Sequence, residues 1–203
     1  MAPELVSGGP ATHALYRVNT AGLGNEGIGK MDVMARKRPF SANDYADWFI
    51  NMTDRGSGEV ITPLMVQRLL FFAQAWHLAN KGRPLFADDF EAWATGPVIV
   101  SVFERFQHTT FECLPFIENA REITGDKLNL LESVHQEYGC YQARKLDELS
   151  QERGGPWEQA RGGRAPEAAC NTLITKEAMK RFYGAKIGKD WQEQRLQGQQ
   201  RSG

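Results

Sequence analysis

The fold is decided by the stretch Thr62–Asn80, which reads TPLMVQRLLFFAQAWHLAN. Thr62 offers a hydroxyl N-cap and Pro63 suits the first helical position, so the stretch opens as a helix. Its apolar residues fall on almost every side, and Gly82 is a C-cap candidate that ends it. Because a helix without a hydrophilic face needs neighbours all round, we expect a buried central helix here.

Segments on both sides of this helix are predicted to supply those neighbours. Ser41 with Asp44 forms a capping-box arrangement that opens one helix. Apolar spacing predicts further helices over 126–138, 142–153 and 175–183, and Gly96-Pro97 can start another. The stretch 83–93 holds a proline and is expected to be extended or a short hairpin. The predicted class is mainly α: a compact single-domain fold around the central helix that can include a short β-hairpin.

The chain has 203 residues and a mass of 22.8 kDa, which favours one domain with tails over two domains. Residues 1–39 are rich in Gly, Ala and Asn without sustained periodicity, and they are predicted to be a flexible tail. Residues 184–203 are Gln-rich and are predicted to be a polar tail. The helical domain is therefore expected over residues 40–183.

Composition narrows the function classes. The net charge is −1, the pI is about 6.4 and no long Lys/Arg run occurs, which argues against nucleic-acid binding. No apolar run reaches the roughly 20 residues that cross a membrane. The three cysteines are widely spaced and odd in number, so we expect buried or partly buried thiols in a reducing compartment. The predicted location is the cytoplasm.

A glycine-rich stretch near the N-terminus resembles a nucleotide-binding loop in spacing only. Residues 22–27 read GLGNEG and fit G-x-G-x-x-G, and the stretch from Gly24 to Lys30 has P-loop spacing up to its lysine. Met31 stands where Mg²⁺ needs Ser or Thr, and no following helix is evident. We interpret the match as coincidence and expect no cofactor.

Candidate catalytic residues are few. Asp88, Asp89 and Glu91 form an acidic cluster that could do acid–base work or hold a cation, but a solvated loop is the favoured interpretation. His77, inside the central helix, is expected to pack with a hydrogen bond rather than act in catalysis. No histidine pair has a zinc-ligand spacing and no G-x-S-x-G motif occurs. We therefore expect no metal site and no enzyme; a hydrolase using these residues is the alternative.

Gln67 and Arg68 are the conspicuous polar interruptions of the central helix. A buried polar side chain must find hydrogen-bond partners. Either Gln67 braces the neighbouring loop, which is the favoured interpretation, or the pair marks where the helix meets a groove or surface.

Several separate motifs occur in one order along the chain. They are Ile61–Leu78, then Gly82-Arg83-Pro84-Leu85-Phe86, Phe90-Glu91-Ala92-Trp93, Gly96-Pro97-Val98, Ser101-Val102-Phe103, and finally Pro156-Trp157. Together they resemble the Panacea domain over about residues 40 to 183. Departures from the family pattern are Phe71-Phe72 in place of Tyr-Tyr, Met65 in place of Lys, and the absence of a Thr-His pair before Pro156.

The resemblance implies a bacterial antitoxin of a toxin–antitoxin system that neutralises a cognate toxin by direct contact. The SocA-like branch of the family implies a proteolytic adaptor that delivers the toxin to the ClpXP protease. Sequestration alone and a DNA-binding autoregulator are the alternatives. The candidate toxin-binding or motif positions are Gln67, Arg68, Phe71, Trp76, Trp93, Gly96, Pro97, Val98, Pro156 and Trp157.

Overall fold

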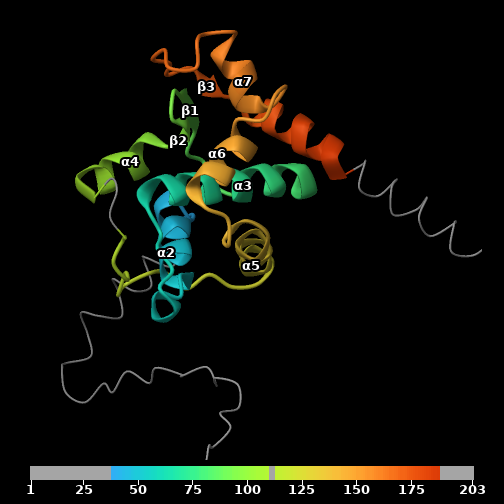
Figure 1. Ribbon diagram of the computed structural model, residues 1–203. Coiled ribbons are helices and arrows are strands. Elements are labelled where there is room, and N and C mark those ends of the chain that lie inside the picture. The colour runs from blue at the N-terminus through green and yellow to red at the C-terminus, as the bar shows by residue number, and fades with distance from the viewer. Residues whose placement is uncertain (1–37, 110–112, 188–203) are drawn as a thin grey trace, which may run out of the picture. The chain divides into compact units, whose positions relative to one another are not determined.

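The computed structural model describes residues 38–109 and 113–187 (Figure 1). The predicted N-terminal tail and the glycine-rich stretch at 22–27 therefore lie outside the described residues, except for Arg38 and Pro39. Of the predicted C-terminal tail, residues 188–203 lie outside them as well. Among the described residues, no helix is both long and apolar enough to cross a membrane.

The central helix is α3, Pro63–Lys81. The Thr62 hydroxyl accepts a hydrogen bond from the Met65 amide at 3.3 Å, and Gly82 ends the helix with a φ of 70°, so both predicted caps are confirmed. Helices α2, α5 and α6 lie around it (Figure 1). Most of its residues are buried, which confirms the expectation of a helix enclosed by its neighbours.

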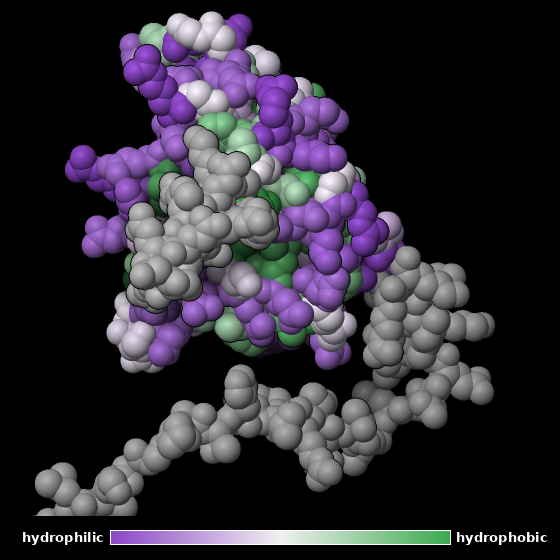
Figure 2. Space-filling view, turned by 90° about the vertical axis from the view of Figure 1, so that its right-hand side faces the viewer, coloured by the Kyte–Doolittle hydropathy of each residue, from purple (hydrophilic) through white to green (hydrophobic). Residues whose placement is uncertain are grey.

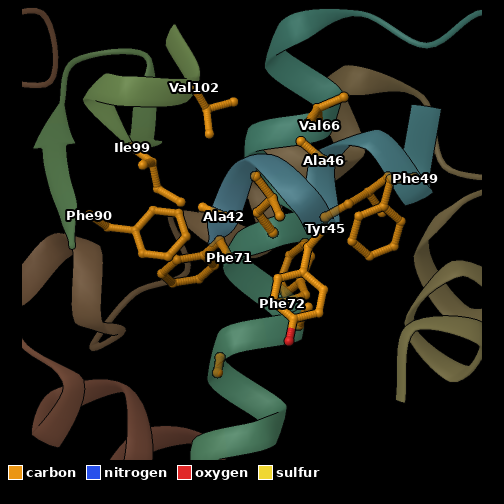
Figure 3. Packing of buried hydrophobic residues seen from close by; sticks show 14 of the residues in the cluster. Ala42, Tyr45, Ala46, Phe49, Val66, Phe71, Phe72, Phe90, Ile99 and Val102 are labelled. Carbon is orange, nitrogen blue, oxygen red and sulfur yellow. The ribbon is translucent and has the colours of Figure 1, made fainter. Parts of the chain in front are cut away.

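Helix α2, Ala42–Met52, packs across α3. The Ser41 amide and hydroxyl both donate to the Asp44 carboxylate, at 2.8 and 2.9 Å, and so form the predicted cap. Figure 3 shows Tyr45 and Phe49 of α2 lying near Phe72 of α3. Burial of such side chains contributes roughly 1.5–3 kcal/mol each, so this face fixes α2 to the central helix.

A small antiparallel sheet lies beside α3, with strand order β2-β1-β3. Its strands are β1 (Phe90–Trp93), β2 (Gly96–Val98) and β3 (Leu173–Ile174). Strands β1 and β2 form a hairpin in which Trp93 faces Gly96. The predicted helix start at Gly96-Pro97 was wrong, because these residues pair with β1 and helix α4, Val100–Phe106, begins later. Pro97 is tolerated because β2 is an edge strand.

The remaining helices surround this frame. Helix α5 spans Asp126–Tyr138, as predicted, whereas α6 spans Ala143–Ser150 and is shorter than the predicted range. Helix α7, Pro156–Arg161, lies against the sheet. A last helix begins at residue 176 and runs to 187, the end of the described residues. There are also two short 3₁₀ turns: η1 (Arg55–Ser57) lies between α2 and α3, and η2 (Gln107–Thr109) follows α4.

Contacts between aromatic rings join α3 to the elements around it. Phe72 stacks on Tyr138 of α5 with ring centroids 4.1 Å apart. Phe71 meets Phe90 of β1 edge-on at 5.4 Å, and Trp76 meets Tyr183 of the last helix at 5.1 Å. Such pairs add about 0.5–1.5 kcal/mol each beyond burial, so one helix anchors three separate neighbours.

The three cysteines are free thiols. Cys170 is buried, but the expectation of buried or partly buried thiols was wrong for Cys113 and Cys140, which are exposed. Cys113 precedes the buried Leu114 in a loop, and Cys140 lies in the turn after α5, so neither packs into the core.

Candidate functional site

Two buried glutamines of α3 hold the main chain of neighbouring loops. The Gln67 amide donates to the Ile99 carbonyl at 3.1 Å and accepts from the Ile99 amide at 2.9 Å. Gln74 donates to the Phe86 carbonyl at 2.9 Å and accepts from the Leu85 amide at 2.8 Å. Each side chain thus satisfies a stretch of main chain that has no regular partner. The expectation that Gln67 braces a neighbouring loop is confirmed.

Arg68 is the charged counterpart of these glutamines, and its residue is only 1% exposed. Its Nε donates to Asp147 of α6 at 2.7 Å, Nη1 donates to the Pro97 carbonyl at 2.8 Å, and Nη2 donates to the Thr95 carbonyl. Burial lowers the pKa of Arg68, and the Asp147 carboxylate opposes that shift. The guanidinium therefore ties α3 to α6 and to the β1–β2 turn.

Gly96 makes room for this guanidinium. Its φ is 112°, a conformation that side chains rarely adopt, and a Cβ there would lie 2.5 Å from Arg68 Nη2. The position of the buried arginine therefore requires a residue without a side chain at 96.

A second buried arginine holds the other side of the hairpin. Arg161 of α7, 2% exposed, donates to the carbonyls of Ala92 at 3.0 Å and Ala168 at 2.8 Å. Next to it, the Trp157 indole donates to the Trp93 carbonyl at 2.9 Å. The Pro156-Trp157 motif therefore has a structural role: its tryptophan binds the main chain of β1 and holds α7 against the strand.

The candidate catalytic residues all have structural partners. Asp88 accepts from the Ala42 amide at 3.0 Å, Asp89 pairs with Lys176, and Glu91 accepts from the Trp93 indole at 2.7 Å. His77 Nδ1 lies 2.8 Å from the Arg83 carbonyl, so the hydrogen bond expected for His77 is present. In the described part of the chain, no group of three or more His, Cys, Asp or Glu residues could hold a metal ion.

The candidate toxin-binding positions are mostly inside the domain. Buried positions are Gln67, Arg68, Phe71, Gly96, Pro97, Val98, Pro156 and Trp157. Trp76 and Trp93 are partly exposed; Trp76 lines a pocket of 440 Å³ between α3 and α5, and Trp93 lines one of 690 Å³ beside the sheet. The structure therefore brings the motif together as a framework and leaves the two tryptophans within reach of a partner.

Exposed apolar side chains gather at the end of α2. Met52, Val60 and Phe116 are 44%, 51% and 59% exposed. Hydrogen bonds hold their segments side by side: Asn51 exchanges bonds with Ile117 at 2.9 and 2.8 Å, and the Leu114 amide donates to the Ile61 carbonyl at 2.9 Å. The face shown in Figure 2 also has hydrophobic surface near its middle, framed by hydrophilic residues.

Sequence reasoning missed Gln74, Asp147 and Arg161. The polar Gln74 on an apolar helix was a signal of the same kind as Gln67. Asp147 carried no local signal, because its partner Arg68 lies 79 residues away. The bond from Arg161 to β1 could not be foreseen either, because Ala92 lies 69 residues away.

Comparison with known proteins gives a consistent picture. Residues 66–158 match the family model described as "Antitoxin SocA-like, Panacea domain". The chain is 31% identical over 144 residues to Antitoxin SocA of Caulobacter vibrioides (strain NA1000 / CB15N), which covers 63% of this chain and 74% of that protein. No solved structure matches the chain.

Proposed function

Because the chain belongs to the SocA-like, Panacea-domain antitoxin family, we propose that it neutralises a co-encoded toxin protein by binding it directly. The observation that carries this proposal is the 31% identity to Antitoxin SocA over 144 residues. The stretch that matches the family, 66–158, contains most of α3, the hairpin and the α6 residue Asp147. These elements are mostly buried and form the structural framework of the domain. We therefore expect the toxin to bind the surface around them.

We propose that the chain acts without catalysis. The polar side chains of the candidate hydrolase, Asp88, Asp89, Glu91 and His77, are engaged in structural hydrogen bonds and ion pairs. A general acid or base needs a side chain free to reach a substrate proton. Because these side chains already have structural partners, a protein that binds its toxin through its surface fits the contacts better than an enzyme that uses these residues in a reaction.

The surface offers features that suit a protein partner. Specific protein interfaces bury about 800 Å² on each side and place apolar anchors at their centre. Met52, Val60 and Phe116 are exposed apolar side chains, and a pocket of 540 Å³ lined partly by Val60 lies beside them. A toxin could therefore be held by ordinary apolar burial.

The fate of the bound toxin is the finer part of the proposal. The family resemblance implies an adaptor of the ClpXP protease, and we propose that the chain presents its toxin for degradation. An adaptor leaves part of its surface free for the protease, whereas sequestration needs only the toxin-binding face.

The experiment is co-expression with the protein encoded by the adjacent gene. The expected result is that the chain restores growth and copurifies with that protein as a defined complex. Restored growth without any complex would contradict direct binding. Toxin half-life, measured with and without ClpX, separates the two mechanisms: a short half-life that needs both the chain and ClpX indicates an adaptor, and an unchanged half-life indicates sequestration.

A further inference from the structure

A small pocket at the C-terminal end of α3 collects positive charge. Its volume is 330 Å³, and its walls come from α3, the loop after α3 and the start of α5. The lining residues are His77, Lys81, Arg83, Pro84, Leu85, Thr124, Asp126 and Lys127. We call it the cationic pocket, after its three cations Lys81, Arg83 and Lys127.

The positive charge of this pocket is not balanced by its own carboxylate. Asp126 pairs with Lys81 at 3.0 Å, and both side chains are largely exposed, at 79% and 49%, so the pair is weak. Among the described residues, the side chains of Arg83 and Lys127 have no hydrogen-bond or ion-pair partner. Lys127 Nζ lies only over the Phe40 ring, 4.7 Å from its centroid. The Asp126 charge also acts on Arg83, so three cations share one carboxylate that already pairs with Lys81.

Burial and neighbouring cations both disfavour the charged form of Lys127. Burial lowers its pKa, and the nearby charges of Arg83 and Arg121 lower it further. Arg121 approaches the same Phe40 ring, at 4.0 Å. A negative group entering the pocket would offset this repulsion, which makes the binding of an anion more favourable than at an isolated lysine.

The start of α5 adds to the same field. The helix is 13 residues long and begins at Asp126, and its N-cap, Gly125, has no side chain to bind the first amides. Unsatisfied amides at a helix N-terminus carry partial positive charge. Because Asp126 and Lys127 line the pocket, this helix end supports the charge that the cations supply.

We propose that the cationic pocket receives an acidic segment of the protein partner, with a carboxylate bound by Arg83 and Lys127. This inference rests on the proposed function and deepens it, because it assigns a place on the surface to the partner. Arg83 can hold a carboxylate with two parallel hydrogen bonds, and such charge-assisted bonds are about twice as strong as neutral ones. Pro84 offers an apolar wall for the neighbouring side chain.

A peptide carboxylate fits the pocket better than a nucleic-acid backbone. Duplex binding typically uses about 6–10 phosphate contacts along a row of cations, and three cations around 330 Å³ do not form such a row. The Asp126 carboxylate would repel neighbouring phosphates. The chain as a whole carries a net charge of −1.

The first test uses the full-length protein and a short glutamate-rich peptide, with the same peptide carrying glutamine at each glutamate as the neutral probe. The charge-reversal variant Arg83→Glu/Lys127→Glu should bind the acidic peptide about tenfold more weakly or worse. The control Lys145→Glu/Arg153→Glu changes the net charge equally at exposed positions and should bind like the wild type. Equal binding of both peptides, equal losses in both variants, or tighter binding of a short DNA duplex would overturn the inference.

Folding is checked by thermal unfolding of each variant. If the charge-reversal variant does not fold, Arg83→Gln/Lys127→Gln removes the charges without reversing them and decides the same comparison. A folded variant of either kind that binds the acidic peptide like the wild type overturns the inference.

The second test replaces the peptide by the co-encoded toxin. Loss of copurification in the charge-reversal variant, with retention in the control, supports the inference. If wild type and charge-reversal variant bind the toxin equally, the inference fails and the proposed function stands. If the wild type itself binds no toxin, the proposed function fails, and the peptide experiment alone decides whether the pocket takes an acidic ligand.

Discussion

Two groups of positive charge on and around α3 are treated in opposite ways by the fold. Arg68, in the first half of the helix, is 1% exposed and donates to a carboxylate and two carbonyls. At the other end, Lys81, Arg83 and Lys127 share one carboxylate, which already pairs with Lys81. A cation whose three nitrogens each donate a hydrogen bond inside the protein stabilises the fold, whereas we propose that cations sharing a single carboxylate bind a partner. The comparison therefore distinguishes the framework around Arg68 from the proposed binding surface at the C-terminal end of α3.

The largest expected effect is on the buried side. Arg68→Leu would leave the carbonyls of Thr95 and Pro97 without their donor, and we expect a loss of about 3 kcal/mol in the free energy of unfolding. Urea denaturation measures it, with Arg153→Leu as the control at an exposed arginine. If Arg68→Leu loses no more free energy of unfolding than Arg153→Leu, Arg68 is not the structural cation that we describe.

Gly96→Ala should come next, at about 2 kcal/mol. The new Cβ would meet the guanidinium at 2.5 Å, in a backbone conformation with φ of 112° that alanine disfavours. Because the clash needs the arginine, the loss should be smaller when Arg68→Leu is already present. Strictly additive losses in the double variant would show that the two residues are independent.

Gln74→Leu should affect both the stability of the framework and the cationic pocket. Its side chain holds the Leu85 and Phe86 main chain, in the loop that also carries Arg83. We expect a loss of about 1.5 kcal/mol from the unsatisfied main-chain groups. We also expect weaker binding of the acidic peptide under conditions where the variant is folded. Unchanged peptide affinity in the folded variant would show that this loop does not position the cationic pocket.

The smallest effect concerns pH. Burial lowers the pKa of His77, and the nearby charges of Arg83, Lys127 and Lys81 lower it further. Since the unfolded state then binds the proton more readily, stability is present above the usual histidine pKa of about 6.5 and falls as the pH drops through it. His77→Asn, which can keep a donor for the Arg83 carbonyl, should lose this part of the pH dependence in urea midpoints. If the wild type and His77→Asn show the same pH dependence of the urea midpoint, a group other than His77 causes it.

Sequence patterns predicted what depends on neighbouring residues. Thr62, Pro63 and Gly82 mark the ends of α3 because caps are local chemistry. Gln67 was correctly expected to brace a loop because it is polar on an apolar helix, although its partner Ile99 could not be named from the sequence. The start of α4 was mispredicted because Gly96-Pro97 suits a turn, a helix start or an edge strand, and only the pairing with β1 decides among them.

The candidate site was less accessible to sequence reasoning. The motif residues could be named from the family resemblance, but their burial could not, since it depends on how α6, α7 and the hairpin close over α3. The cationic pocket gave no signal at all. Lys81 and Arg83 are far in sequence from Lys127, and a net charge of −1 conceals a local excess of cations.

Amide hydrogen exchange of the chain, alone and with its co-encoded toxin, tests the central claim most directly. If the exterior of the domain binds the toxin at the cationic pocket, amides of the loop 82–86 and the start of α5 should become protected. Amides around the buried Arg68 are expected to exchange slowly in the free protein and should change little. Binding that leaves 82–86 and the start of α5 unprotected would contradict the placement of the toxin at the cationic pocket. Binding that instead opens the hairpin and α6 around Arg68 would contradict the division into framework and binding surface.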